Sequence, residues 1–286
     1  MRRIRAVSAF PTLFTLGNLV CGFFAIVVAA RIPRPDDFPT PESPKLDSVR
    51  ELLGSLDPTH NLMLCGGLIF IAMAFDVFDG QVARMARVTS DFGAQLDSLC
   101  DVVSFGVAPG ILLVKMCPQF ANVHREAIWF IAALYACCAA MRLARFNVEM
   151  DEEDDHSWFE GLPSPAAAAV IASFALFSYT LRNEINYDNF KTFDAWLQLL
   201  LPLVAVVIAL MMVSRIPYPH AVNFFIRGQK SFPQLVGIVV SLLALVAVGR
   251  YAIPVFCGLY ALAPPLVHAW RWTANRRNRP SLHKAG

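Results

Sequence analysis

The sequence predicts an all-α integral membrane protein with about eight transmembrane helices, and both composition and patterning indicate it. Of the 286 residues, 56% are hydrophobic and only 16% are charged, whereas soluble domains carry about 25% charged residues. Uncharged apolar stretches of about 20 residues, the length that crosses a bilayer, recur along the chain. This composition excludes a soluble enzyme, and a net charge of +2 is too small to indicate a nucleic-acid partner.

Eight apolar segments are candidates for membrane-crossing helices. The last two are joined only by Gly249 and Arg250 and would form a tight helical hairpin. The eight segments are residues 10–30, 62–79, 92–116, 127–146, 165–181, 196–213, 235–248 and 251–270.

The distribution of Lys and Arg predicts the orientation in the cell membrane. With the N-terminus in the cytoplasm, most of the 24 Lys and Arg residues fall on the cytoplasmic side, which is the positive-inside pattern. An even number of spans returns the C-terminus to that side. The predicted divisions are a basic cytoplasmic N-terminus at 1–9, a membrane domain at 10–270 with a Pro-rich external loop at 31–60, and a basic cytoplasmic tail at 271–286.

Four aspartates stand at the end of the second apolar segment and the start of the third. Asp76 and Asp79 are three residues apart, and Asp97 and Asp101 are four apart. These spacings place each pair on one face of a helix. The turn between the segments, about residues 86–91, is short enough to make the two helices antiparallel. We therefore expect the four carboxylates to converge at the cytoplasmic rim of the membrane.

Such a cluster points to bound cations. An Asp at the centre of a transmembrane helix costs about 2.5–3.5 kcal/mol, and four facing carboxylates cannot all stay ionised without cations. Oxygen ligands select hard divalent ions such as Mg²⁺ or Mn²⁺, and a two-metal site suits displacement at phosphorus. Two alternatives stay open on these residues alone. One is a set of salt bridges to Arg84 and Arg87, and the other is a cation or proton transporter.

The residues around the aspartates fit a phosphate-bearing ligand. Gly80 and Ala83 leave one helix face without bulk, so that a ligand can approach the backbone. Arg84 can neutralise a pyrophosphate through two hydrogen bonds. Gly93, one turn before Asp97, opens the facing helix in the same way.

Together these residues match every position of a known signature. The chain resembles the CDP-alcohol phosphotransferase family, whose signature has eight fixed positions, here Asp76, Asp79, Gly80, Ala83, Arg84, Gly93, Asp97 and Asp101. Further stretches are similar to the branch of this family that transfers a phosphatidyl group to serine. They are residues 10–18, 96–110, 142–147 and 161–167, with a looser match at 212–218.

The resemblance implies a fold, a reaction and partners. It implies a six-helix core, here extended to eight, a polar cavity facing the cytoplasm, and a homodimer in the membrane. The reaction is transfer of the phosphatidyl group of CDP-diacylglycerol to the hydroxyl of L-serine, which gives phosphatidylserine and CMP. The closest alternative acceptors are glycerol 3-phosphate and an inositol phosphate.

The resemblance also implies roles for the signature residues. Two divalent cations, Mg²⁺ or Mn²⁺, would be bound by Asp76, Asp79 and Asp97, while Asp101 completes the second metal site and serves as general base. CDP-diacylglycerol would lie against its binding residues, which are Gly80, Ala83, Arg84 and Gly93.

Two arginines of the fourth segment are candidates for binding serine. Arg142 and Arg145 are three residues apart, hence roughly on one helical face. One of them would bind the serine carboxylate. The alternative is that both extend to lipid headgroups and set the topology.

Overall fold

Nearly all of the described chain is helical. The computed structural model describes residues 9–32, 58–86, 91–150, 158–182, 187–219 and 252–277. The helices are α1 (Ala9–Ala30), α3 (Pro58–Ala86), α4 (Asp91–Asp101), the π-helix η2 (Val102–Val107), α5 (Ala108–Met116), α6 (Pro118–Val123), α7 (Arg125–Met150), α8 (Ser164–Arg182), α9 (Tyr187–Val213) and α12 (Ala252–Arg277). Two short strands, β1 (Trp158–Glu160) and β2 (Pro217–Pro219), complete the described elements.

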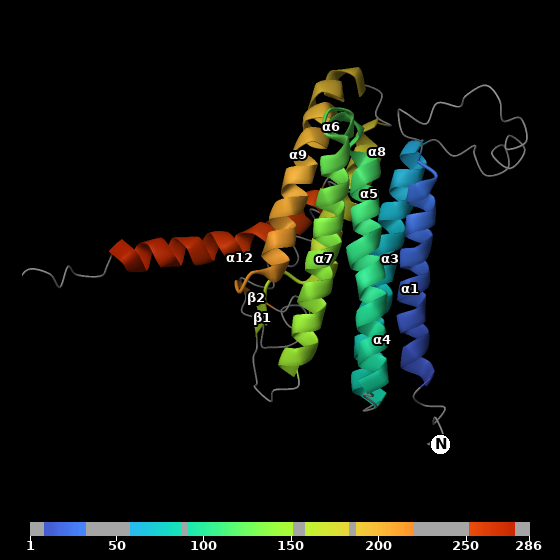
Figure 1. The fold of residues 1–286 in the computed structure, drawn as a ribbon, viewed down its shortest axis with the longest axis vertical. Helices are drawn as coiled ribbons and strands as arrows, with labels where there is room; N and C mark the ends of the chain where they lie inside the picture. The colour runs from blue at the N-terminus through green and yellow to red at the C-terminus, as the bar shows by residue number, and fades with distance from the viewer. Residues whose placement is uncertain are drawn as a thin grey trace, which may run out of the picture.

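Six segments of this structure are long and apolar enough to cross a membrane. They are Thr12–Ala30, His60–Gly80, Phe92–Met116, Arg125–Val148, Ser164–Arg182 and Lys191–Val213. Each coincides with one of the first six segments predicted from the sequence, and they lie side by side as a bundle (Figure 1). The prediction of an all-α membrane protein with a six-helix core is therefore confirmed.

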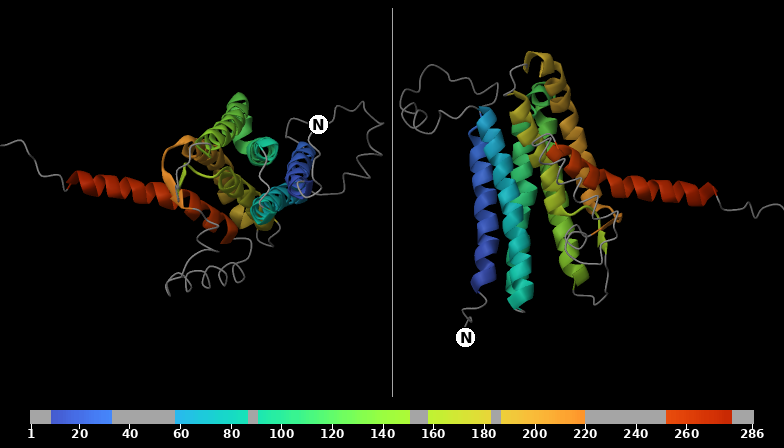
Figure 2. Two further views of the ribbon diagram at one scale, coloured as in Figure 1. Left: turned by 90° about the horizontal axis from the view of Figure 1, so that it is seen from below. Right: turned by 180° about the vertical axis from the view of Figure 1, so that it is seen from behind.

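The last two predicted spans have a different outcome. Residues 235–248 lie outside the described residues. Residues 251–270 correspond to α12, whose apolar part, Ala252–His268, is shorter than the six spans. This helix runs across the bundle and projects away from it (Figures 1 and 2). It contains Pro264 and Pro265 and continues to Arg277, past the predicted boundary at residue 270.

Small residues let the helices of the bundle pack closely. Helix α3 packs against both α1 and α8, and α8 buries Ala167, Ala168, Ala172 and Ala175. At Gly66 of α3, an added Cβ would lie 2.9 Å from the Ala172 carbonyl oxygen. In lipid, close packing of this kind replaces the hydrophobic effect as the main attraction between helices.

The third span changes its winding immediately after Asp101. The Ala108 N–H bonds to the Val103 carbonyl, one residue farther back than in an α-helix, and the resulting π-helix occupies Val102–Val107. Pro109, which follows, has no N–H to donate to the Phe105 carbonyl. Short π segments inside α-helices are frequent at functional sites.

A two-stranded ribbon fastens the end of the bundle at which α7 ends and α8 begins. Strands β1 and β2 are antiparallel, with Phe159 opposite Tyr218. Gly161 follows β1 with a φ of +80°, and its N–H donates to the Ile216 carbonyl over 2.9 Å. A Cβ there would lie 2.4 Å from the Met212 carbonyl oxygen. Only glycine therefore suits this turn.

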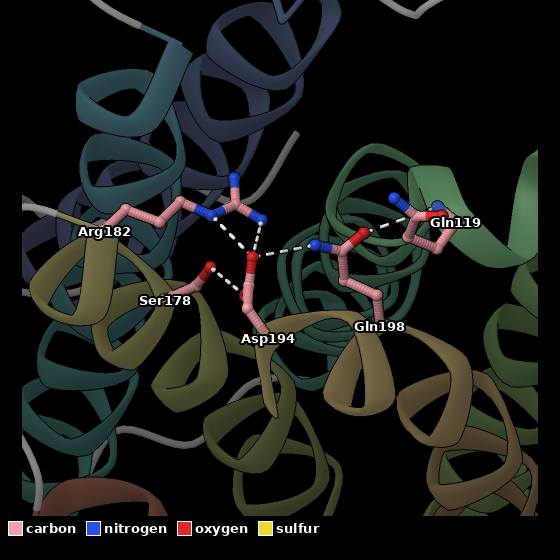
Figure 3. A network of polar contacts seen from close by, with 5 residues as sticks. All are labelled: Gln119, Ser178, Arg182, Asp194 and Gln198. Atoms are coloured by element: carbon pink, nitrogen blue, oxygen red, sulfur yellow. Dashed lines mark hydrogen bonds and ion pairs between the residues drawn. The ribbon is translucent and has the colours of Figure 1, made fainter. Parts of the chain in front are cut away.

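The far end of α8 carries a buried polar network (Figure 3). Asp194 of α9 is 2% exposed and pairs with Arg182 of α8 at 3.0 Å. Gln198 donates to the same carboxylate over 3.0 Å and accepts a hydrogen bond from the Gln119 backbone N–H. The network ties α8, α9 and α6 together, and its polar atoms satisfy one another.

Asp194→Ala is expected to destabilise the protein without changing its site chemistry. Removing one partner of a buried ion pair costs about 3–5 kcal/mol, which for a chain of this size lowers the melting temperature on the order of 10 °C. Thermal unfolding of the purified protein in detergent measures this. An unchanged melting temperature would show that the network does not hold α8 and α9 together.

Candidate active site

Three of the four predicted aspartates meet between α3 and the third span. Helix α3 continues past its apolar part to Ala86, and α4 begins at Asp91, so the connection is as short as predicted. Carboxylate oxygens of Asp76, Asp97 and Asp101 lie within 4.8 Å of one another. The three-and-four-residue spacing thus brings carboxylates from two antiparallel helices to one place.

The fourth aspartate has a partner on another helix. Asp79 is 7% exposed and accepts a hydrogen bond from the hydroxyl of Thr15 on α1. Its charge still acts on Asp76 and Asp97. Asp79 therefore lies beside the cluster of three, while its carboxylate is held by α1.

Helix α1 also holds Asp101. The side-chain amide of Asn18 donates to Oδ1 of Asp101 over 2.8 Å, and the backbone carbonyl of Asn18 accepts a hydrogen bond from Ser104 over 3.0 Å. The close approach depends on Gly22, where a Cβ would lie 2.8 Å from the Cα of Ser104. Without a side chain at this position, α1 and η2 come close enough for Asn18 to reach the carboxylate.

The donor set of this cluster fits a divalent cation. Asp101 is 6% exposed, and the buried Oδ1 of Asp97 has no hydrogen-bond partner among the described residues. Among the described side chains, which do not include those of Arg84 and Arg87, no Lys or Arg forms an ion pair with the three carboxylates. Buried carboxylates are paired or bind metals, and oxygen-only ligands suit Mg²⁺ or Mn²⁺.

Arg142 is the described arginine that acts on the cluster. It is 8% exposed, and its charge acts on both Asp101 and Asp76. Its guanidinium donates to the Ser164 hydroxyl over 3.0 Å and lies 5.7 Å from the centre of the Phe146 ring. Of the two arginines predicted to bind serine, Arg142 is the one whose charge acts on the carboxylates.

Arg145 has a different environment. Its guanidinium donates to the carbonyl oxygens of Glu160, Val213 and Ser214 over 2.8, 3.2 and 3.3 Å. These carbonyls belong to the end of β1, to the end of α9 and to the residue after it. Arg145 thus fastens the ribbon to the bundle. Although the two arginines are only three residues apart, Arg142 bonds to the Ser164 hydroxyl and Arg145 bonds to these carbonyls.

The predicted nucleotide-binding residues fall on the same two helices. Gly80 is exposed on α3, and Gly93 is half-buried on α4. Ala83 and Arg84 lie in the last turn of α3, and their side chains are outside the described residues. Five residues after Gly93, Ser98 of α4 exchanges hydrogen bonds with Asn147 of α7, with an Asn147 Nδ2 to Ser98 Oγ distance of 2.9 Å.

A polar Asn18 in the first apolar segment is expected to face the protein interior, and the structure buries it fully against Asp101. The contact of Thr15 with Asp79 was not predicted. Thr15 and Asn18 are three residues apart and therefore share one helical face. Both are polar side chains inside an apolar span, and such side chains hydrogen-bond to neighbouring helices. That spacing was the available signal, but it does not say which carboxylate each residue would meet.

The fold and the cluster define a class. This is a multi-pass membrane protein whose first three spans enclose a buried carboxylate site. Residues 8–213 match the CDP-alcohol phosphatidyltransferase family, and the chain belongs to that family. Of the alternatives that the carboxylates alone left open, membership favours an enzyme over a transporter.

Curated relatives extend the match over nearly the whole chain. The chain is 29% identical to a CDP-diacylglycerol–serine O-phosphatidyltransferase of Helicobacter pylori, over 91% of this chain and 90% of that protein. It is 34% identical to one of Methanocaldococcus jannaschii, over 68% of this chain and 79% of the relative. A third, from Bacillus subtilis, is 30% identical over 65% of this chain and 93% of the relative.

Proposed function

We propose that this enzyme transfers the phosphatidyl group of CDP-diacylglycerol to the hydroxyl of L-serine, giving phosphatidylserine and CMP. The observation that carries the proposal is the cluster of Asp76, Asp97 and Asp101, formed by signature residues of two adjacent helices within 4.8 Å of one another. The names of the relatives from three organisms support serine as the acceptor.

The aspartates are the residues that would hold two divalent cations, Mg²⁺ or Mn²⁺. Asp76, Asp97 and Asp101 offer oxygens to a common point, and Asp79, held by Thr15, would complete the set. When bound, the cations supply positive charge against the phosphates of the substrate and against the charge that grows on CMP as it leaves.

Asp101 is the proposed general base. The serine hydroxyl is too weak an acid to ionise at neutral pH, so its proton must move during the attack on phosphorus, a contribution of about 10²–10⁴ in rate. Asn18 engages Oδ1 of Asp101. The carboxylate is thereby fixed in orientation, and Oδ2 is the oxygen that would accept the proton.

Arg142 is the proposed partner of the serine carboxylate. It is buried beside Asp101, whose charge acts on it, so a serine bound to Arg142 would present its hydroxyl near the base. The Arg145 guanidinium donates to backbone carbonyls, and we propose that this residue stabilises the ribbon and does not bind substrate. The nucleotide would lie against Gly80, Ala83 and Arg84, with Gly93 leaving room on the facing helix.

We propose that the site faces the cytoplasm. Helix α1 begins at the end of the bundle where α3 ends and α4 begins (Figure 1). The aspartates lie in the second half of α3 and the first half of the third span, and hence toward that end. Six spans return the chain to that end after α9, and the positive-inside pattern assigns it to the cytoplasm. The N-in, C-in orientation, the domain divisions and the homodimer stay predictions, which labelling of single cysteines in intact cells and mass measurement in detergent would check.

Asn18→Ala is expected to lower kcat by about ten- to a hundredfold, because residues that orient a catalytic or metal-binding group contribute on that scale. CMP release under saturating substrates measures this. Thr180→Ala is the matched control, since this hydroxyl bonds only within α8, to the Leu176 carbonyl, near the other end of the bundle. Equal kcat in wild type and Asn18→Ala would remove Asn18 from the site.

The test of the proposed function is a comparison of acceptors. Purified protein in detergent receives CDP-diacylglycerol and Mg²⁺ or Mn²⁺, with L-serine, glycerol 3-phosphate or inositol phosphate offered separately. We expect CMP release that requires serine. Release with only one of the phosphorylated acceptors would keep the reaction type and overturn serine as the substrate.

A further inference from the structure

Helix α1 places a buried amide oxygen at the carboxylate cluster. Among the described residues, four buried side-chain nitrogen or oxygen atoms have no hydrogen-bond partner. Two of the four belong to this site, namely Oδ1 of Asp97 on α4 and Oδ1 of Asn18 on α1. Leaving such a buried acceptor unpaired costs about 1–3 kcal/mol. Since neither oxygen can donate a proton, a partner for them must be a cation or a hydrogen-bond donor.

The orientation of the Asn18 amide follows from its contact with Asp101. Its Nδ2 donates to Oδ1 of Asp101 over 2.8 Å, and an ionised carboxylate only accepts hydrogen bonds. The nitrogen must therefore face Asp101, and Oδ1 of Asn18, bonded to the same carbon, lies beside the cluster. The backbone of Asn18 is held as well, because its carbonyl accepts the hydrogen bond from Ser104 over 3.0 Å. Side chain and backbone are thus both fixed by neighbouring residues.

A divalent cation suits this oxygen better than a hydrogen-bond donor does. Carbonyl and carboxylate oxygens together are ligands that Mg²⁺ and Mn²⁺ prefer. Mg²⁺ lies about 2.0–2.1 Å from its ligands, whereas a hydrogen-bonded nitrogen lies about 2.9 Å from its acceptor. Asn18 is 0% exposed, so the partner with the shorter contact is favoured. The three carboxylates within 4.8 Å of one another attract a cation to the same place.

We propose that Asn18 is a further metal ligand, through Oδ1, and that cation binding fastens α1 to the helices that carry the aspartates. The presence of the cations rests on the proposed function, while the choice of this oxygen rests on the contacts of Asn18. The amide has two tasks, because Nδ2 orients Asp101 and Oδ1 binds the cation. A neutral oxygen adds a ligand to an octahedral shell without adding negative charge to a site that already holds four aspartates.

Exchange of this oxygen for sulfur tests the assignment without substrate. A thiolate is a soft ligand that suits Mg²⁺ and Mn²⁺ poorly, and its bond to Cd²⁺ gives an ultraviolet charge-transfer absorption. Purified Asn18→Cys in detergent is titrated with Cd²⁺, and wild type, with its seven cysteines, gives the background. We expect an added absorption that saturates at about one Cd²⁺ per chain. Thr180→Cys is the control and should match wild type, since Thr180 bonds only within α8.

The affinity for Mn²⁺ is measured on the same variants by the paramagnetic resonance of the free ion. It is expected to fall about tenfold or more in Asn18→Cys, since residues that only orient a ligand already contribute that much, and to stay unchanged in Thr180→Cys. Weaker Mn²⁺ binding without the Cd²⁺ absorption would mean that Asn18 acts only through Asp101, and would overturn its role as a ligand. If the absorption appears but CDP-diacylglycerol and serine give no CMP, the proposed function fails while the ligand role holds.

A measurement on the native chain decides the question if Asn18→Cys does not fold. The protein is labelled with ¹³C in the side-chain carbonyl of asparagine, loaded with Mn²⁺ and examined by electron–nuclear double resonance. A contact coupling to ¹³C requires a direct bond between Mn²⁺ and the amide oxygen, and we expect one in wild type. Asn147→Ala is the control and should keep it, because Asn147 bonds to Ser98. Wild type without this coupling would contradict the assignment of Asn18.

Discussion

Asp101→Asn is expected to reduce serine-dependent CMP release by about 10³-fold, within the range for loss of a general base. The exchange keeps the shape of the side chain and an oxygen that can accept the hydrogen bond from Asn18, which spans 2.8 Å in the native protein. It removes the negative charge and the capacity to take the serine proton. The loss should therefore appear in kcat under saturating serine and metal.

Asp194→Asn is the matched control for this variant. Asp194 is as buried as Asp101, with 2% exposed against 6%, but it pairs with Arg182 at the other end of α8. That end is about 27 Å from Ser164 at the α-helical rise. The control should lose stability and keep its CMP release per folded molecule. If Asp101→Asn kept more than about a tenth of wild-type activity, Asp101 would not be the base.

Removal of divalent cations is expected to stop the reaction almost completely. Three carboxylates within 4.8 Å of one another repel strongly when nothing neutralises them, and the substrate brings further negative charge. Treatment with a chelator should reduce CMP release to below about one per cent, since metals supply several kcal/mol of charge stabilisation at such sites. Addition of Mg²⁺ or Mn²⁺ should restore it.

The position of a metal-binding carboxylate should matter as well as its charge. Asp97→Glu moves a carboxylate by about one ångström and is expected to cost on the order of 10²-fold in activity. Glu126→Asp is the control. This substitution removes one methylene where Asp97→Glu adds one, and Glu126 is exposed near the start of α7. Full activity after exhaustive chelation would contradict the metal assignment.

The six core spans could be predicted because apolar length is a local property of the chain. Each span found in the structure coincides with a predicted segment. The sequence pattern is less informative for α12. Its residues are apolar enough to suggest a span, but the direction of a helix depends on what it packs against, here α8 and the Tyr218 hydroxyl. No local pattern specifies those contacts.

The carboxylate cluster could also be predicted, because spacings of three and four residues and a short turn determine which side chains meet. The polar partners could not. Thr15 lies 64 residues from Asp79 and Asn18 lies 83 from Asp101, and such pairs form only when α1 docks against α3 and η2. The different environments of Arg142 and Arg145 likewise depend on the ribbon, whose strands are separated by some 60 residues of sequence.

The most direct measurement follows one oxygen atom. L-serine labelled with ¹⁸O in its hydroxyl group is supplied with CDP-diacylglycerol and metal, and both products are analysed by mass spectrometry. If the serine hydroxyl attacks the phosphorus that bears the diacylglycerol, phosphatidylserine carries the label and CMP carries none. Label in CMP, or formation of CMP without labelled phosphatidylserine, would contradict the proposed reaction.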